Sequence, residues 1–220
     1  MVSRILQKPL KYRKSFFLLG PRGTGKTYWI KQNLADAVYI DLLDTETYTL
    51  LLGNPHRLLD FVPKGYKSWI VIDEVQKVPA LLNEVHRLIE NEGHIFVLTG
   101  SSSRSLRKKG VNLLAGRALM YHMHPLVAQE IGEDFDLVQS LTYGMLPATL
   151  SEPDLVAYLK AYVAAYLREE VMQEGLTRNL SAFTRFLEIA SFSQGQVLNM
   201  SAIAREASTS QKNVSNYFDI

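Results

Sequence analysis

The feature that most constrains the fold is a glycine-rich octapeptide that lies between an apolar run and a helix-like segment. The apolar run covers residues 15–19, and the helix-like segment covers residues 27–33. The octapeptide consists of Gly20, Pro21, Arg22, Gly23, Thr24, Gly25, Lys26 and Thr27. Glycines permit backbone conformations that other residues avoid, so successive N–H groups can converge on phosphate oxygens at a helix N-terminus. The spacing matches the P-loop template and predicts a strand–loop–helix unit that binds a nucleoside triphosphate.

Two side chains of this loop have predicted roles in phosphate and metal binding. Lys26 is expected to bridge the terminal phosphates, and the Thr27 hydroxyl is expected to bind Mg²⁺. We therefore expect ATP and Mg²⁺ as cofactors, with residues 20–27 as the nucleotide-binding segment. The alternative is a chance glycine turn, which average composition would produce in a chain of this length on the order of one time in a hundred.

Short apolar runs alternate with helical patterns in the first half of the chain. The runs are rich in β-branched and aromatic residues and show little polar alternation, which is typical of strands buried on both faces of a parallel sheet. The expected strands are residues 15–19, 37–41, 69–72, 94–99 and 118–123, and a helix is expected over 79–91. This alternation predicts an α/β fold, a P-loop NTPase with a parallel, doubly wound, five-stranded sheet.

The second half of the sequence has a helical character. No convincing strand follows Met123, and a helix is expected to begin near residues 151–154, with Ser151 as its N-cap, Pro153 in the first turn and Asp154 at the third position. Leu155 and Val163 belong to the apolar face expected for this helix. We predict an ATPase core over 1–125, a helical lid or linker over 126–178, and a partial winged helix-turn-helix over 179–220.

Two carboxylates end the third apolar run. Asp73 and Glu74 follow residues 69–72, at the end of a strand where ligands gather in parallel sheets. Asp73 is expected to support the Mg²⁺ shell, and Glu74 is expected to polarise the attacking water as general base. The alternative is an acidic pair that simply ends a strand at the surface.

The fourth apolar run also ends in small polar residues. Thr99, Gly100 and Ser101 follow residues 94–98. Ser101 is our candidate to orient the water or contact the γ-phosphate, and Thr99 is its competitor for that role. A polar strand end without any ligand contact is the alternative.

Taken together, these motifs resemble those of the AAA+ ATPases. The resemblance rests on the loop at 20–27, on Val71-Ile72-Asp73-Glu74, on Leu98-Thr99-Gly100-Ser101 and on Leu113-Leu114-Ala115-Gly116-Arg117 before the fifth expected strand. It implies a homo-oligomer in which Arg117 acts as an arginine finger toward a neighbouring subunit's nucleotide; a structural surface arginine is the alternative. More narrowly, the chain is similar to prokaryotic fused ATPases with a winged-helix-like C-terminal region. The second-sensor arginine of such proteins has no clear counterpart here, and Arg168, Arg178 and Arg185 are the candidates.

Residues 200–219 have the rhythm of a helix-turn-helix. Residues 208–210 are expected to form the turn, with Ser208 in place of the usual glycine and Thr209 or Ser210 as the cap of the next helix. Val214 and Tyr217 are expected to face the core. In a DNA reader, Gln211, Lys212, Asn213 and Ser215 would face the groove. A protein-contact or lid role is the alternative partner hypothesis for these helices.

Bulk properties exclude several other classes of protein. The net charge is +2, so no global electrostatic field indicates a nucleic-acid or membrane partner. The chain has no cysteine, which excludes disulfides and thiolate metal sites, and no apolar run is long enough for a membrane span. We expect a cytoplasmic protein. The sequence ends at Ile220 without a wing, which is consistent with a fragment of a longer protein.

The motifs predict Mg²⁺-dependent ATP binding and hydrolysis that is coupled to the C-terminal helices. Two alternatives remain open: a nucleotide-gated switch with little turnover, and a DNA-binding regulator with a secondary ATPase activity. A GTPase is disfavoured because the chain has no Asn-Lys-x-Asp base-reading motif.

Overall fold

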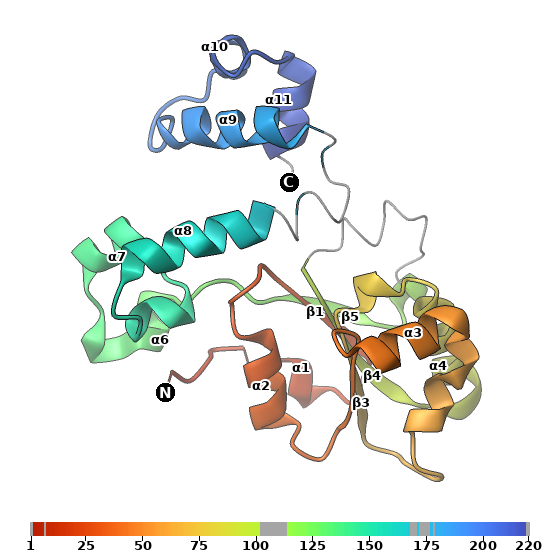
Figure 1. Cartoon of the computed structure of the whole chain (residues 1–220). Helices are drawn as coiled ribbons and strands as arrows, with labels where there is room; N and C mark the ends of the chain where they lie inside the picture. Colours follow the sequence, from red (N-terminus) through yellow and green to blue (C-terminus); the bar gives the residue numbers. More distant parts are fainter. Residues whose placement is uncertain are drawn as a thin grey trace. The chain divides into compact units, whose positions relative to one another are not determined.

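A parallel five-stranded sheet forms the centre of the first part of the chain (Figure 1). The structure is a computed structural model that describes residues 2–6, 8–101, 114–167, 171, 177 and 179–218. The strands are β1 Phe16–Leu19, β2 Val38–Asp41, β3 Trp69–Asp73, β4 Ile95–Gly100 and β5 Leu119–His122. Their order is β2-β3-β4-β1-β5, and every pairing is parallel. The predicted five-stranded parallel sheet is thereby confirmed.

Helices cover both faces of this sheet, as expected for strands without polar alternation. The α-helices of this part are α1 Lys8–Lys11, α2 Lys26–Asn33, α3 Thr45–Gly53, α4 Leu81–Glu92, α6 Ala128–Ile131 and α7 Leu137–Tyr143. Short 3₁₀ helices connect them: η1 Pro55–Phe61, η2 Val75–Lys77, η3 Leu114–Gly116, η4 Gly132–Asp134 and η5 Pro147–Leu150.

The alternation of side chains along each strand divides the core into two layers. Phe17 and Leu19 of β1 point into a cluster with residues of α3, η1 and α4. Phe16 and Leu18 point to the opposite face, where they join Trp29 and other residues of α2. Figure 1 shows α2 on one side of the strands and α3 and α4 on the other. The result is the doubly wound arrangement, which directs the carboxyl ends of all five strands to one edge.

The chain divides by its internal contacts into two units, 1–153 and 154–220. The second unit contains α8 Leu155–Tyr166, α9 Leu180–Ser191, α10 Met200–Glu206 and α11 Gln211–Phe218. Phe183 and Phe186 of α9 pack with Ile203, Val214 and Tyr217 in its core. No strand follows β5 in the part of the chain that the structure describes.

Two details of the helix that begins after Pro153 differ from expectation. The N-cap is Asp154, whose carboxylate accepts a hydrogen bond from the Ala157 N–H at 2.9 Å, and not Ser151. Asp154 is the N-cap because it directly precedes the first helical residue, where its carboxylate can accept a hydrogen bond from an N–H group of the first turn. Val163, expected on a packed face, is 49% exposed. No helix among the described residues is long and apolar enough to cross a bilayer.

Candidate nucleotide-binding and catalytic site

The glycine-rich loop connects β1 to α2 and has the backbone conformation expected from its sequence. Gly23 and Gly25 have φ angles of 78° and 89°, in the left-handed region that glycine tolerates best. Gly25 is the N-cap of α2, and its carbonyl accepts the first helical hydrogen bond from the Trp29 N–H at 2.9 Å. The loop therefore ends at the positive end of a helix that starts directly beneath it.

Position 20 requires glycine for a different reason, which is the lack of space for a side chain. Its N–H donates to the Gly100 carbonyl at 3.2 Å, which continues the pairing of β1 with β4. A Cβ atom at this position would lie 2.1 Å from the Met123 carbonyl oxygen. The chain after β5 thus passes so close to the start of the loop that no side chain fits at residue 20.

The Lys26 side chain lies under the loop. It is only 7% exposed, and its Nζ donates to the carbonyl oxygens of Gly20 at 2.7 Å and Pro21 at 3.0 Å. The Thr24 hydroxyl also donates to Pro21, at 2.9 Å, whereas Pro21 and Arg22 are exposed. A buried ammonium group is therefore held within the loop, where it can attract a phosphate.

Asp73, at the end of β3, lies at the meeting point of three hydroxyl groups. Its carboxylate is 4% exposed and accepts hydrogen bonds from Thr27 at 3.1 Å, from Tyr39 of β2 and from Thr99 of β4. Burial, together with the hydrogen bond to Asp73, raises the pKa of Tyr39, so its hydroxyl remains a donor at neutral pH. These donors compensate the carboxylate for the water that it loses by burial.

Glu74 follows Asp73 in a left-handed conformation, with φ 60° and ψ 45°. Its N–H donates to the Thr99 hydroxyl at 2.9 Å, and its carboxylate accepts a hydrogen bond from the Gln76 amide. A non-glycine residue in this conformation is strained, and such strain is concentrated at functional sites. Thr99 is thus hydrogen-bonded to both residues of the acidic pair.

The other predicted site residues lie at two different edges of the sheet. Ser101 follows β4 at the carboxyl edge, close to the loop, because the preceding Gly100 contacts Gly20. Arg117 precedes β5 at the amino edge and pairs with Glu90 of α4. Arg117 is therefore remote from the P-loop of its own chain, which restricts any finger role to a neighbouring subunit. Of the second-sensor candidates, Arg185 lies in α9, whereas Arg168 and Arg178 lie outside the described residues.

The oxygen donors at Thr27 and Asp73 suit a hard divalent cation. No group of three or more His, Cys, Asp or Glu side chains that could hold a metal occurs within the described ranges. Mg²⁺ commonly binds to proteins through one or two side-chain oxygens and completes its shell with phosphates and water. The hydroxyl–carboxylate pair fits this type of site.

Sequence reasoning overlooked two residues that contact the acidic pair, Tyr39 and Gln76. Tyr39 is aligned with Val71 of β3, a register that no local pattern reveals. Gln76 interrupts the apolar residues Val75 and Val78. A polar residue next to apolar positions, two residues after Glu74, is a sequence signal that could have pointed to Gln76.

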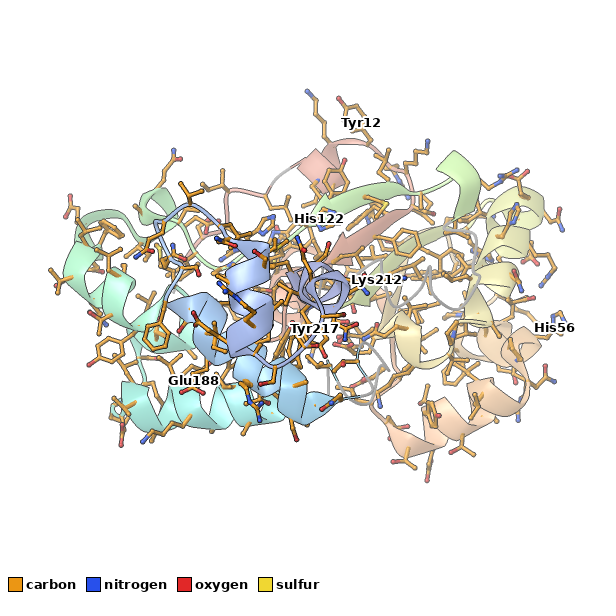
Figure 2. The ribbon with its side chains drawn as sticks, turned by 90° about the horizontal axis from the view of Figure 1, so that it is seen from above. Tyr12, His56, His122, Glu188, Lys212 and Tyr217 are labelled. Carbon is orange, nitrogen blue, oxygen red and sulfur yellow. The ribbon has the colours of Figure 1, made fainter. Side chains whose placement is uncertain are left out.

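The C-terminal unit contains the predicted pair of helices, α10 and α11, joined by a tight turn. Ser208 has φ 51° in this turn, and the Ser210 hydroxyl accepts from the Asn213 N–H at 3.1 Å, as a cap does. Tyr217 is buried in the core of the unit, as predicted, and Lys212 on the same helix is exposed; both residues are labelled in Figure 2.

Comparison with known proteins gives matches over both parts of the chain. Residues 12–132 match a family described as an AAA domain, and residues 134–220 match a domain of unknown function, DUF8612. An uncharacterized protein of Methanocaldococcus jannaschii is 28% identical over 170 residues, which is 74% of this chain and 37% of that protein. The chain therefore spans little more than a third of the length of this relative.

Among solved structures, the Orc1 protein of Aeropyrum pernix in complex with DNA aligns with a TM-score of 0.35 and 14% identity, over 94% of this chain and 76% of that chain. The AAA family match covers more than half of the 220 residues and includes the P-loop, the acidic pair and all five strands. The chain therefore belongs to the AAA domain family of P-loop ATPases.

Proposed function

We propose that this chain binds Mg·ATP through residues 20–27 and hydrolyses it, with Glu74 as the general base. The observation that supports this most directly is the 3.1 Å hydrogen bond between Thr27 and Asp73. It joins two motifs that are 46 positions apart in the sequence, at a point where a cation would find a hydroxyl and a carboxylate oxygen together.

Each side chain has a separate task in this proposal. Lys26 exchanges its loop carbonyl partners for the terminal phosphates, and the loop N–H groups hold the remaining phosphate oxygens. Thr27 and Asp73 would hold Mg²⁺, which would neutralise charge on the phosphates when bound. Glu74 accepts the proton of the attacking water, and Ser101 orients that water or the γ-phosphate.

The first experiment measures phosphate release with Mg·ATP. Lys26→Ala serves as the blank, and Glu74→Gln is expected to bind ATP but to lose turnover by at least about a hundredfold. Glu133→Gln is the matched control, because Glu133 is an exposed acid in η4. Parent turnover by Glu74→Gln would remove the base assignment. Binding by the parent chain without phosphate release would favour the nucleotide-gated switch.

The proposed arginine finger requires a second copy of the chain. Arg117 lies at the sheet edge opposite the loop, so one subunit would supply the arginine and its neighbour the P-loop. Arg117→Ala removes the first contribution and Lys26→Ala removes the second. Each variant alone is expected to be inactive, and their mixture is expected to recover part of the parent activity. Activity per chain should also rise with protein concentration. No recovery in the mixture, with concentration-independent activity in the parent, would exclude the trans role.

A second candidate function is DNA binding through α11. The specific observation is that Gln211, Lys212, Asn213 and Ser215 are all exposed on this helix, while Val214 and Tyr217 anchor it in the core. Salt-dependent anisotropy with duplex DNA tests this role. Lys212→Ala is expected to weaken binding and to reduce the slope of log K against log salt by about one, whereas Lys64→Ala, an exposed control, should not.

We also infer that the nucleotide state is coupled to the C-terminal helices. The motivation is the presence of a separate compact unit, 154–220, on the same chain as the nucleotide site. Limited proteolysis with and without Mg·ATP tests the coupling. Cleavage within 154–220 should change rate in the parent but not in Lys26→Ala; identical rates in the parent would contradict it.

A further inference from the structure

The Gln76 side chain lies between the candidate base and the end of β4. It is 6% exposed, and its Nε2 donates to Oε2 of Glu74. Its Oε1 lies against Gly100, where a Cβ atom would approach that oxygen to 2.7 Å. The amide is therefore packed against the strand end on one side and hydrogen-bonded to the carboxylate on the other.

The backbone of Glu74 is fixed without help from Gln76. The Glu74 N–H donates to Thr99 at 2.9 Å, and the Glu74 carbonyl accepts from the Lys77 N–H at 2.9 Å. These bonds hold the left-handed conformation but leave the side-chain torsions of a glutamate unconstrained. Among the contacts found in the described chain, the Gln76 amide is the one that fixes the carboxylate itself.

We propose that Gln76 is the positioning residue for the Glu74 carboxylate. This inference rests on the proposed role of Glu74 as base. A carboxylate has two oxygens with about four acceptor positions. The amide occupies Oε2 and leaves Oε1 for the proton of the attacking water, so it sets the direction from which the base acts. A displacement of about 1 Å in such a group can lower a rate about a hundredfold.

The first test replaces the amide by an apolar chain of similar length. Gln76→Met is expected to lower turnover about tenfold to a hundredfold. Equilibrium ATP affinity should stay within about twofold, because Gln76 has no proposed contact with the nucleotide. The unfolding midpoint, measured alongside, reports how far the lost hydrogen bond to the carboxylate destabilises the folded state. The double variant Glu74→Gln, Gln76→Met should be no slower than Glu74→Gln alone, since Gln76 acts only through Glu74.

A second variant approaches the same amide from its other side. Gly100→Ala places a methyl group against Oε1 of Gln76, and the flexible end of that side chain moves more easily than the backbone. We expect slower turnover by Gly100→Ala. The double variant Gly100→Ala, Gln76→Met should be no slower than the slower of the two single variants. This variant keeps the proposal testable if Gln76→Met fails to fold.

The outcomes separate this inference from the proposed function. Parent turnover by Gln76→Met, with Glu74→Gln inactive, would overturn the positioning role and leave the base assignment intact. Multiplied losses in the double variant would also overturn it, because Gln76 would then act independently of Glu74. Parent turnover by Glu74→Gln would refute the base assignment and the inference together.

Discussion

Thr99→Val removes a hydroxyl group and keeps the shape of the side chain, so it isolates the two hydrogen bonds at the end of β4. The Thr99 hydroxyl is fully buried, donates to Asp73 and accepts from the Glu74 N–H at 2.9 Å. An unsatisfied buried N–H costs about 1–3 kcal/mol, and a hydrogen bond to a charged group contributes about 1.5–3 kcal/mol. Because Asp73 keeps its donors from Thr27 and Tyr39, we expect a total near the lower end, about 3 kcal/mol.

Urea unfolding monitored by tryptophan fluorescence measures this loss. The chain has two tryptophans, Trp29 and Trp69, and both lie in the unit that contains the site. With a slope of about 2 kcal/mol per molar urea, a loss of about 3 kcal/mol lowers the midpoint by about 1.5 M. Thr99→Ser keeps the hydroxyl and loses only a methyl group, so it should lose about 1 kcal/mol.

Thr142→Val is the matched control in the same unit. Thr142 is exposed, and its hydroxyl donates to the Val138 carbonyl of its own helix at 2.7 Å, so its replacement should change stability by less than about 0.5 kcal/mol. If Thr99→Val lost no more than Thr142→Val, the reasoning about the buried hydroxyl would be refuted. Ser101→Ala, by contrast, should slow turnover, measured as phosphate release with Mg·ATP.

Three further changes test other parts of the structure. Gly20→Ala should destabilise the sheet unit by about 3 kcal/mol and abolish ATP binding, because its Cβ would lie 2.1 Å from the Met123 carbonyl oxygen; urea unfolding and nucleotide titration measure both effects. The hydrogen bond from Arg87 lowers the pKa of the buried Glu84. Glu84 therefore stabilises the folded state above its unfolded pKa and loses this contribution as pH falls through the lower folded pKa. The difference in stability between the parent and Glu84→Gln should become smaller below about pH 4.3, which an acid titration of urea midpoints would detect. Ser208→Gly should stabilise the C-terminal unit by about 0.5 kcal/mol, measured by circular dichroism, because it relieves a left-handed φ of 51° at some cost in unfolded-state entropy.

Matched controls for these three changes are substitutions of the same residue type, or of another acid, at positions that lack the contact or backbone strain under test. Gly53→Ala, with open space around the added Cβ atom, should be close to neutral or slightly stabilising. Asp60→Asn removes a partner from the exposed Arg57 pair and should show almost no acid dependence. Ser210→Gly removes the cap of Asn213 and should destabilise by a few tenths of a kcal/mol, opposite in sign to the change in the turn.

The sheet was predictable because its strands are short, apolar and buried on both faces. Each of the five expected runs lies within one or two residues of a strand, and the P-loop conformation follows from glycines whose φ angles are positive. Periodicity was less informative in the second half. The start of α8 was misjudged because Ser151 and Asp154 both suit an N-cap, and only the geometry of the first turn decides between them.

The internal contacts of the site were predictable only in part. The acidic pair and the loop could be brought together from the rule that ligands gather at strand ends. The partners of Asp73 could not be derived in this way, because Tyr39 and Thr99 reach it through the alignment of β2 and β4 on either side of β3. Strand order and register depend on contacts throughout the core, and no local window of sequence contains them.

The three donors to Asp73 come from three different elements, and this arrangement has a consequence for nucleotide binding. Thr27 belongs to the loop helix, whereas Tyr39 and Thr99 belong to the two strands that flank β3. A hydroxyl that turns toward a metal ion takes its hydrogen bond away from the carboxylate, and only Thr27 has such a proposed role. Tyr39 and Thr99 would still hold the buried Asp73 in place at that moment. In the proposed Mg²⁺ site, the carboxylate would thus be oriented before a cation arrives, which would reduce the cost of organising the site on binding.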